Sequence, residues 1–114
     1  IVVSNHGGRR LDGMPATINR LELVAEAVDD RAELLLDSGI RRGTDVLKAL
    51  ALGARAVLVG RPYTWALAAD GEAGVSQVIG FLKEELQNAM VSCGCHRVGD
   101  IRPELLLNLP GKAR

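Results

Sequence analysis

The sequence predicts an α/β fold built on a parallel sheet. Three short apolar runs alternate with segments of helical periodicity, and each run leads directly into a polar loop that contains glycine. Repeated strand–loop–helix units of this kind favour parallel strands joined by right-handed crossovers. The chain has 114 residues, enough for one modest domain, and we expect that domain to span residues 1–114.

The first predicted unit covers residues 1–28. Residues 1–4 open with Ile-Val-Val, a β-branched run that favours a strand, and residues 5–10 form a polar loop with two glycines. Apolar residues then recur at helical spacing from Ile18 to Val28, which predicts an amphipathic helix.

The second predicted unit begins with a strand at residues 33–37. Its three consecutive leucines show no alternation, which is typical of a strand covered on both faces. After a loop at residues 38–43, Thr44 or Asp45 is expected to cap a helix that runs from about 45 to 52.

The third predicted unit begins with a strand at residues 56–59. Pro62 suits the first turn of a helix to about residue 69, and Asp70-Gly71 is expected to break that helix. The aromatic residues Tyr63 and Trp65 are expected to pack against neighbouring helices. A longer amphipathic helix follows from about 75 to 90. We expect a last short helix over residues 100–107 and then a Pro-Gly tail.

In all three units the residues that could take part in binding or catalysis directly follow a strand: His6 and Arg9, then Asp37 and Arg41, then Gly60 and Arg61. An open doubly wound sheet and a (β/α)8 barrel both accommodate such units. Barrel active sites collect at the C-terminal ends of the strands, and phosphate often binds the loops after the last two strands. We therefore interpret the chain as the last three βα units of a (β/α)8 TIM barrel with its C-terminal helices. A whole barrel needs about 250 residues, and the chain begins without Met, so we expect an upstream segment.

Composition narrows the function classes. Lys+Arg and Asp+Glu balance at 14 each, which gives no electrostatic case for binding nucleic acid. No signal peptide and no apolar run of the roughly 20 residues that span a bilayer are visible, so we expect a location in the cytoplasm or at the membrane periphery. Cys93 and Cys95 are too few for a disulfide framework or a zinc site, and we expect no metal.

The first loop carries an acid–base pattern. In Ser4-Asn5-His6-Gly7-Gly8-Arg9, the glycines let the backbone turn and approach a ligand closely. A histidine accepts protons near neutral pH, and an arginine binds a carboxylate with two hydrogen bonds. The pair suits oxidation at the carbon alpha to a carboxylate. A structural histidine beside a solvated arginine is the alternative interpretation.

The second and third loops carry an anion-binding pattern. In residues 37–45, small residues after the strand lead into a helix N-terminus, where backbone N–H groups are available to a phosphate, and Arg41 adds positive charge. Asp37 would hold a ligand hydroxyl or orient Arg41. Gly60-Arg61-Pro62 repeats the design, so two adjacent loops favour one phosphate site. Plain turns and helix caps are the alternative.

These motifs together resemble a known family. Ser-Asn-His-Gly-Gly-Arg from Ser4, followed by Leu-Asp-Gly and Pro-Ala, resembles the active-site signature of the FMN-dependent 2-hydroxy-acid dehydrogenases, which include glycolate oxidase, lactate oxidase, lactate monooxygenase, flavocytochrome b2 and mandelate dehydrogenase. The resemblance continues through residues 36–54, 59–62 and 70–75, and it covers about residues 1–107.

The resemblance implies an FMN enzyme that oxidises an (S)-2-hydroxy acid, similar to lactate or glycolate, to the 2-oxo acid. Oxygen, a quinone or a cytochrome would accept the electrons, and the full-length protein would be a homo-oligomer. His6 would be the base and Arg9 the carboxylate clamp. The residues implied to bind FMN are Ser4, Asp37, Ser38, Gly39, Ile40, Arg41, Gly60 and Arg61.

Two features set this chain apart from the family pattern. Ser38 stands where the family commonly shows glycine, but serine is small and can donate a hydrogen bond, so we expect binding to survive. The family's upstream lysine and tyrosines cannot be placed here, and we expect little turnover from this chain alone. A non-catalytic half-barrel that binds phosphate or FMN is the alternative function. A flavin-type isopentenyl diphosphate isomerase would explain the phosphate motifs but not His6 and Arg9.

Overall fold

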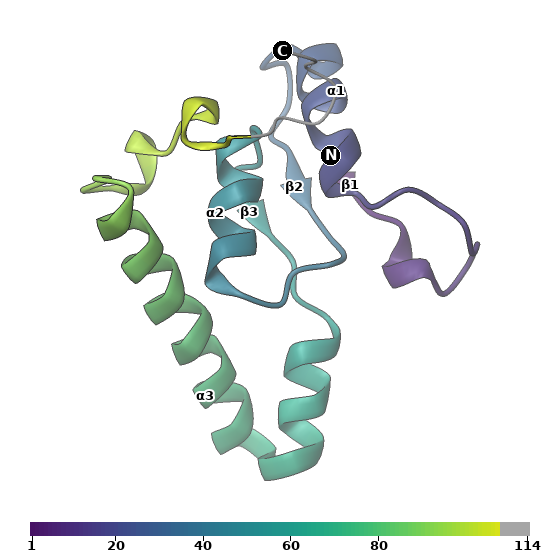
Figure 1. Ribbon diagram of the computed structural model, residues 1–114. Coiled ribbons are helices and arrows are strands. Elements are labelled where there is room, and N and C mark those ends of the chain that lie inside the picture. Colours follow the sequence, from purple (N-terminus) through teal and green to yellow (C-terminus); the bar gives the residue numbers. More distant parts are fainter. Residues whose placement is uncertain (108–114) are drawn as a thin grey trace.

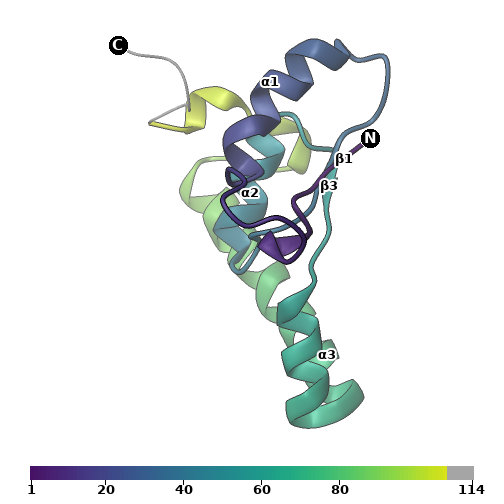
Figure 2. The ribbon, with the colours of Figure 1, turned by 90° about the vertical axis from the view of Figure 1, so that its right-hand side faces the viewer.

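The computed structural model describes residues 1–107. Its centre is a three-stranded parallel sheet in the order β1–β2–β3, which confirms the predicted α/β class (Figure 1). The strands are shorter than the sequence predicted: β1 is Val2–Val3, β2 is Leu35–Leu36 and β3 is Ala56–Val57. The helices that follow the first two strands are α1 (Ile18–Val28) and α2 (Gly43–Ala51). Figure 2 shows both helices on the same side of the strands.

One face of the sheet forms the core. Side chains from that face and from the two helices make a single buried apolar cluster, whose members are Leu21, Val28, Leu34, Leu36, Ile40, Ala49, Leu52 and Ala54. On the other face, Val2 and Leu58 are 49% and 40% exposed, and Leu35 is only half-buried. No element of residues 1–107 packs on that second face, so the prediction that the second strand is covered on both faces is met on one face only within the described residues.

Helix α2 begins two residues earlier than the sequence predicted. The Asp45 carboxylate accepts hydrogen bonds from the backbone N–H groups of Arg41 and Arg42, both at 3.0 Å. Because these bonds satisfy donors that precede the helix, the first turn can start at Gly43. Asp45 thus stabilises the helix start from inside the first turn.

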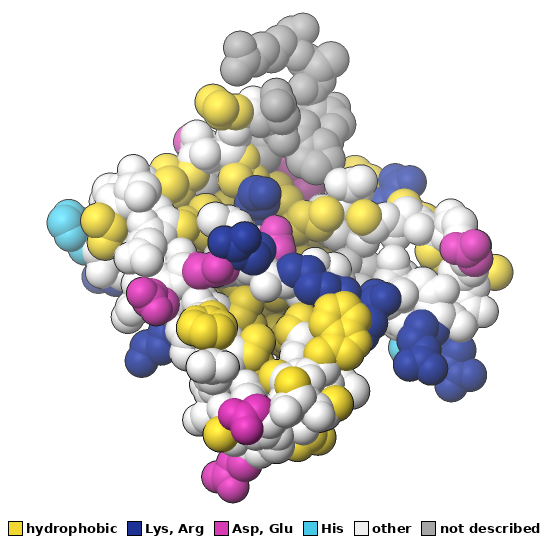
Figure 3. Space-filling view, turned by 60° about the horizontal axis from the view of Figure 1, so that its bottom comes forward, with side chains coloured by type: hydrophobic (Ala, Val, Ile, Leu, Met, Phe, Trp, Pro, Cys, Tyr) yellow, Lys and Arg dark blue, Asp and Glu magenta, His cyan; other side chains and the backbone are white. Residues whose placement is uncertain are grey.

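Helix α3 (Arg61–Ser92) is a hairpin of two helical legs. Its backbone leaves helical geometry at Asp70 and Gly71, which confirms the predicted break, and the two legs run in opposite directions (Figure 1). The hairpin projects beyond the sheet in both ribbon views, and hydrophobic side chains show on its surface (Figure 3). Although α3 is 32 residues long, no helix of the described part is long and apolar enough to cross a membrane.

The predicted helix over residues 100–107 is wrong. The described chain forms two short 3-10 helices instead, η2 (Val98–Asp100) and η3 (Pro103–Leu105). The Asp100 carboxylate accepts hydrogen bonds from two preceding backbone N–H groups, and this arrangement closes a single turn. Pro103 has no N–H to continue a helix. The predicted Pro-Gly tail lies outside the described residues.

Candidate active site

A cavity of about 540 Å³ lies at the carboxyl ends of the three strands. Its lining residues are His6, Gly7, Arg9, Arg10, Asp37, Ser38, Gly39, Ile40, Arg41, Leu58, Gly60, Arg61 and Thr64. Every residue that the sequence predicted for the site is in this set except Ser4, whose hydroxyl donates to the Asp37 carboxylate at 2.5 Å. The structure therefore gathers the base, clamp and phosphate candidates around one space.

His6 lies in a short 3-10 turn, η1 (His6–Gly8), that the sequence did not predict. Its φ is +53°, in the left-handed region that side chains disfavour. The turn is held by the two side chains that precede it: the His6 N–H donates to Ser4 Oγ at 3.1 Å, and the Gly7 N–H donates to Asn5 Oδ1 at 3.0 Å. A strained backbone that neighbouring groups hold in place is typical of functional sites.

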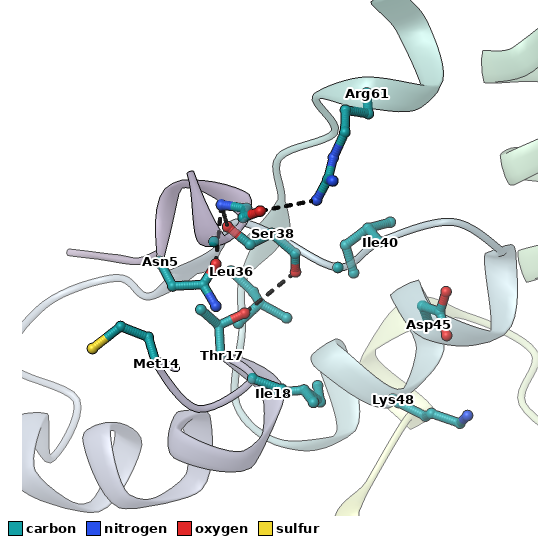
Figure 4. A pocket seen from close by; sticks show the side chains of 14 residues that line it. Asn5, Met14, Thr17, Ile18, Leu36, Ser38, Ile40, Asp45, Lys48 and Arg61 are labelled. Carbon is teal, nitrogen blue, oxygen red and sulfur yellow. Dashed lines mark hydrogen bonds between the residues drawn. The ribbon is translucent and has the colours of Figure 1, made fainter. Parts of the chain in front are cut away.

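Gly7 joins the three loops. Its N–H also donates to Ser38 Oγ of the second loop at 3.0 Å, and its carbonyl accepts from Arg61 Nη2 of the third loop at 3.2 Å (Figure 4). A Cβ at position 7 would stand 3.0 Å from that arginine nitrogen, and φ there is +66°. The positive φ therefore favours glycine at position 7, and a Cβ there would crowd the Arg61 guanidinium.

Asp37 is the ionised centre of this network. Its Oδ2 accepts hydrogen bonds from the hydroxyls of Ser4 and Ser38, at 2.5 and 2.9 Å. Burial raises the pKa of Asp37, but these hydrogen bonds and the charge of nearby His6 together lower it below its usual value. The carboxylate is therefore negative at neutral pH and near enough to His6 for the two charges to interact.

The candidate anion-binding side of the cavity is built from two arginines and two glycines. Arg41 Nη1 donates to the carbonyl of Ile40 at 2.8 Å, and Arg41 and Arg61 both line the cavity. A Cβ at Gly39 or Gly60 would meet no protein atom within 4 Å, so the space beside both backbones is open to a ligand. Two cations converging on open backbone suit a phosphate monoester.

Trp65 is the unexpected neighbour of this arginine pair. The prediction that Tyr63 and Trp65 pack against helices is not met, since they are 46% and 58% exposed. The Arg41 guanidinium instead lies 5.5 Å from the centroid of the Trp65 ring, within the range of a cation–π interaction. The first leg of α3 thereby restricts the position of the Arg41 guanidinium.

Arg9 and Arg10 both line the cavity, and within residues 1–107 neither side chain makes a hydrogen bond or ion pair. Of these two arginines, only Arg9 was predicted from the sequence. Asn5 and Thr17 were not predicted; the buried Thr17 hydroxyl donates to the Asp37 carbonyl at 2.8 Å. An asparagine before two glycines is a recognisable turn signal. The partner of Thr17 is 20 residues away, so no local signal existed.

A second cavity of about 440 Å³ adjoins the first and extends toward the starts of α1 and α2 (Figure 4). It shares Gly7, Ser38, Gly39, Ile40 and Arg61 with the first cavity. The three linked loops therefore separate the two cavities, and the hydrogen bonds between the loops limit how far each loop can move.

The FMN-dependent dehydrogenase family model matches residues 1–108. The chain belongs to the FMN-dependent dehydrogenase family. It is 57% identical to L-lactate oxidase of Nostoc sp. over 93% of this chain, and 56% identical to 2-hydroxyacid oxidase 1 of Homo sapiens over 96%. It is 52% identical to pre-mycofactocin synthase of Mycolicibacterium smegmatis over its whole length. These matches cover 29–30% of the three relatives, so the chain spans less than a third of their length.

The fold agrees with the family assignment. A mandelate oxidase solved with (S)-2-phenylpropionate superposes with a TM-score of 0.86 at 57% identity, over 90% of this chain and 30% of that one. The resemblance inferred from the motifs is confirmed, and FMN is the cofactor of the family. The two arginines, the open glycines and the ionised Asp37 fit that cofactor, because FMN carries a phosphate monoester on a chain of hydroxyl groups.

Proposed function

We propose that this chain supplies the base, the substrate clamp and the FMN phosphate site of an enzyme that oxidises an (S)-2-hydroxy acid to the 2-oxo acid. The observation that carries the proposal is the single cavity shared by His6, Arg9, Arg41 and Arg61. Lactate, 2-hydroxyacid and mandelate oxidases among its relatives and structural neighbours support that substrate class.

Each residue then has a definite task. FMN, when bound, would accept the α hydrogen and two electrons of the substrate. Arg41 and Arg61 would hold its phosphate, and Asp37 would accept a hydrogen bond from its ribityl chain. Arg9 would bind the substrate carboxylate with two N–H groups, which orients the α carbon. A ring nitrogen of His6 would take the hydroxyl proton, and the negative Asp37 would stabilise the resulting imidazolium.

We further propose that the three units are the last three of a (β/α)8 TIM barrel. The exposed second face of the sheet and the outer edges of β1 and β3 are surfaces that further strands of a barrel would cover. We therefore expect the purified 114-residue chain to turn over little 2-hydroxy acid. Robust turnover by that chain would contradict this proposal.

A non-catalytic FMN- or phosphate-binding half-barrel is the second candidate. It is favoured by the fact that this chain provides the anion-binding side of the cavity on its own. The pre-mycofactocin synthase that matches the whole chain shows that the family also includes proteins not named as 2-hydroxy-acid oxidases. Binding of FMN without any bleaching by 2-hydroxy acids would favour this second candidate.

The deciding experiment is flavin bleaching. FMN absorbance of the intact protein is followed anaerobically while lactate, glycolate and mandelate are added in turn. His6→Ala is expected to keep the yellow colour and to slow bleaching by about 10²- to 10⁴-fold, the usual range for general base catalysis. His96→Ala is the matched control, because the other histidine is exposed and lies outside the cavity. Rapid bleaching in His6→Ala would remove His6 from the base role.

A further inference from the structure

Ser38 holds a backbone conformation that glycine adopts far more readily. Its φ is +80°, and the next residue, Gly39, has a similar φ of +84°. The left-handed region is strained for any residue with a Cβ, so a glycine at position 38 would relieve the backbone. A serine at this position therefore indicates that its hydroxyl contributes something that a glycine would lose.

The hydroxyl of Ser38 connects two loops. It donates to Asp37 Oδ2 at 2.9 Å and accepts the Gly7 N–H at 3.0 Å, although Gly7 lies 31 residues earlier in the chain. Because a hydroxyl has one hydrogen to give, that hydrogen is already committed to Asp37. The Ser38 side chain therefore faces the interior of the loop network rather than offering a free donor to a cofactor.

We propose that Ser38 is a positioning residue that fixes the His6 turn against the loop of Asp37 and Arg41. The inference rests on the proposed function of His6 as base. Gly7 follows His6 directly, so a fixed Gly7 N–H fixes the direction from which the imidazole enters the cavity. Arg61 holds the carbonyl of Gly7, and together the two bonds tie the base-bearing turn to both phosphate loops.

This arrangement matters because proton transfer depends steeply on geometry, and an error of about 1 Å in placement costs on the order of 100-fold in rate. Asn5 Oδ1 also accepts the Gly7 N–H, so the turn persists without the serine hydroxyl but becomes less constrained. Loss of the hydroxyl should therefore affect the reaction more than the fold or the binding of FMN.

Three substitutions separate the hydroxyl from the backbone strain. Ser38→Gly removes both, Ser38→Ala removes the hydroxyl and keeps the strain, and Ser38→Thr keeps the hydroxyl with at least as much strain. In the intact protein, we expect the rate of anaerobic flavin bleaching to fall about tenfold in the Gly and Ala variants, as for loss of one hydrogen bond, and Thr to restore most of it. FMN affinity should stay within about twofold, whereas the Tm of the Gly variant should exceed that of the Ala variant by about 2–4 °C.

Hydrogen exchange of the peptide that contains His6–Gly8 provides a readout independent of turnover. We expect faster exchange in the Gly and Ala variants than in the wild type, with the peptide of α2 unchanged as a control. A Gly variant with wild-type bleaching and wild-type exchange would overturn the positioning role. Absence of bleaching in the wild type itself would instead refute the proposed function. In that case, exchange in the His6–Gly8 peptide alone would test whether Ser38 fixes the turn. Faster exchange in the variants would support this role, and unchanged exchange would refute it.

Discussion

The sheet with α1 and α2 buries large side chains, whereas the α3 hairpin buries small ones. Leu21 and Leu36 are 0% and 1% exposed, while the buried residues of α3 are Pro62 and Gly74. At Gly74 a Cβ would stand 2.2 Å from the carbonyl oxygen of Ala66, so the two legs of the hairpin touch through backbone. The body is thus stabilised by apolar burial, and the hairpin by close approach and a few polar bonds.

The hairpin also differs from the body in how many large apolar side chains it leaves exposed. Its large side chains with about half or more of their surface exposed are Trp65, Leu67, Ile79, Phe81 and Val91. Burial of an apolar side chain contributes about 1.5–3 kcal/mol relative to leaving it exposed. Substitutions of the same chemistry should therefore have very different effects in the two regions.

Leu36→Ala should have the largest effect. The side chain is 1% exposed in the centre of the core, so we expect the free energy of unfolding to fall by about 2–5 kcal/mol. Leu67→Ala is the matched control in the hairpin, where the side chain is 52% exposed, and it should change stability by about 0.5 kcal/mol or less. Urea denaturation of the 114-residue chain measures both values, and equal losses would refute the contrast.

Gly43→Ala tests where the hairpin is attached. A Cβ at Gly43 would stand 2.2 Å from the backbone nitrogen of Leu86 and 2.5 Å from the backbone of Glu85. The return leg of α3 would have to move away from α2, so we expect a loss of about 1–3 kcal/mol, typical of overpacking. The Gly43 N–H would also lose its 2.8 Å hydrogen bond to Glu85 Oε2.

Gly80→Ala provides the control with the opposite sign. A Cβ there would meet no protein atom within 4 Å, and the residue lies inside the helical return leg. Alanine should stabilise the leg by up to about 1 kcal/mol, because it loses less backbone entropy on folding. Relative to the wild type, the Tm should thus fall in Gly43→Ala and rise in Gly80→Ala. A Tm for Gly43→Ala equal to or above that of the wild type would mean that α3 does not depend on the contact at position 43.

Local sequence patterns predicted where the helices and strands lie better than they predicted what packs against them. Helical periodicity and the Asp70-Gly71 pair were enough to place α1 and the break in α3, because both depend on neighbours within a few residues. The three leucines of residues 34–36 predicted coverage on two faces, but only one covering layer is present within residues 1–107. What packs on a strand depends on long-range partners that no local pattern contains.

The same distinction applies to the candidate site. Parallel strands bring their carboxyl ends together, so position after a strand was sufficient to place His6, Asp37 and Arg61 around one cavity. The hydrogen bond from Gly7 to Ser38 and the contact between Arg41 and Trp65 were not predicted. Both depend on the atomic separation of segments more than 20 residues apart, which sequence spacing does not encode.

Trp65→Leu tests whether the hairpin contributes to the site. Removing the ring should release the Arg41 guanidinium and weaken FMN binding about two- to fivefold, corresponding to about 0.5–1 kcal/mol for an exposed cation–π contact. Trp65→Phe keeps an aromatic face and should recover part of the loss. Tyr63→Leu removes an exposed ring that does not line the cavity, and it serves as the control. Quenching of flavin fluorescence on titration measures each affinity, and equal values for Trp65→Leu and Tyr63→Leu would refute the role.

The smallest expected effect is the pH dependence of hairpin attachment through Glu85. Its carboxylate accepts the Gly43 N–H and pairs with Arg42 Nε at 2.7 Å. The hydrogen bond from the Gly43 backbone is the main reason that the pKa of Glu85 lies below its usual value of 4.5. Because the folded state then binds fewer protons than the unfolded state, this contribution is complete well above pH 4.5 and is lost as pH falls through 4.5 toward the lower folded pKa.

Glu85→Gln should therefore lower the Tm at pH 7 and leave it nearly unchanged near pH 3, so that its stability varies less with pH than that of the wild type. Asp37 and Asp100, whose pKa values are also lowered, should preserve part of the acid sensitivity in this variant. Glu84→Gln removes the same charge one residue away and should keep the wild-type pH profile. If both glutamine variants flatten the profile equally, net charge rather than the contact with Gly43 governs how the hairpin responds to acid.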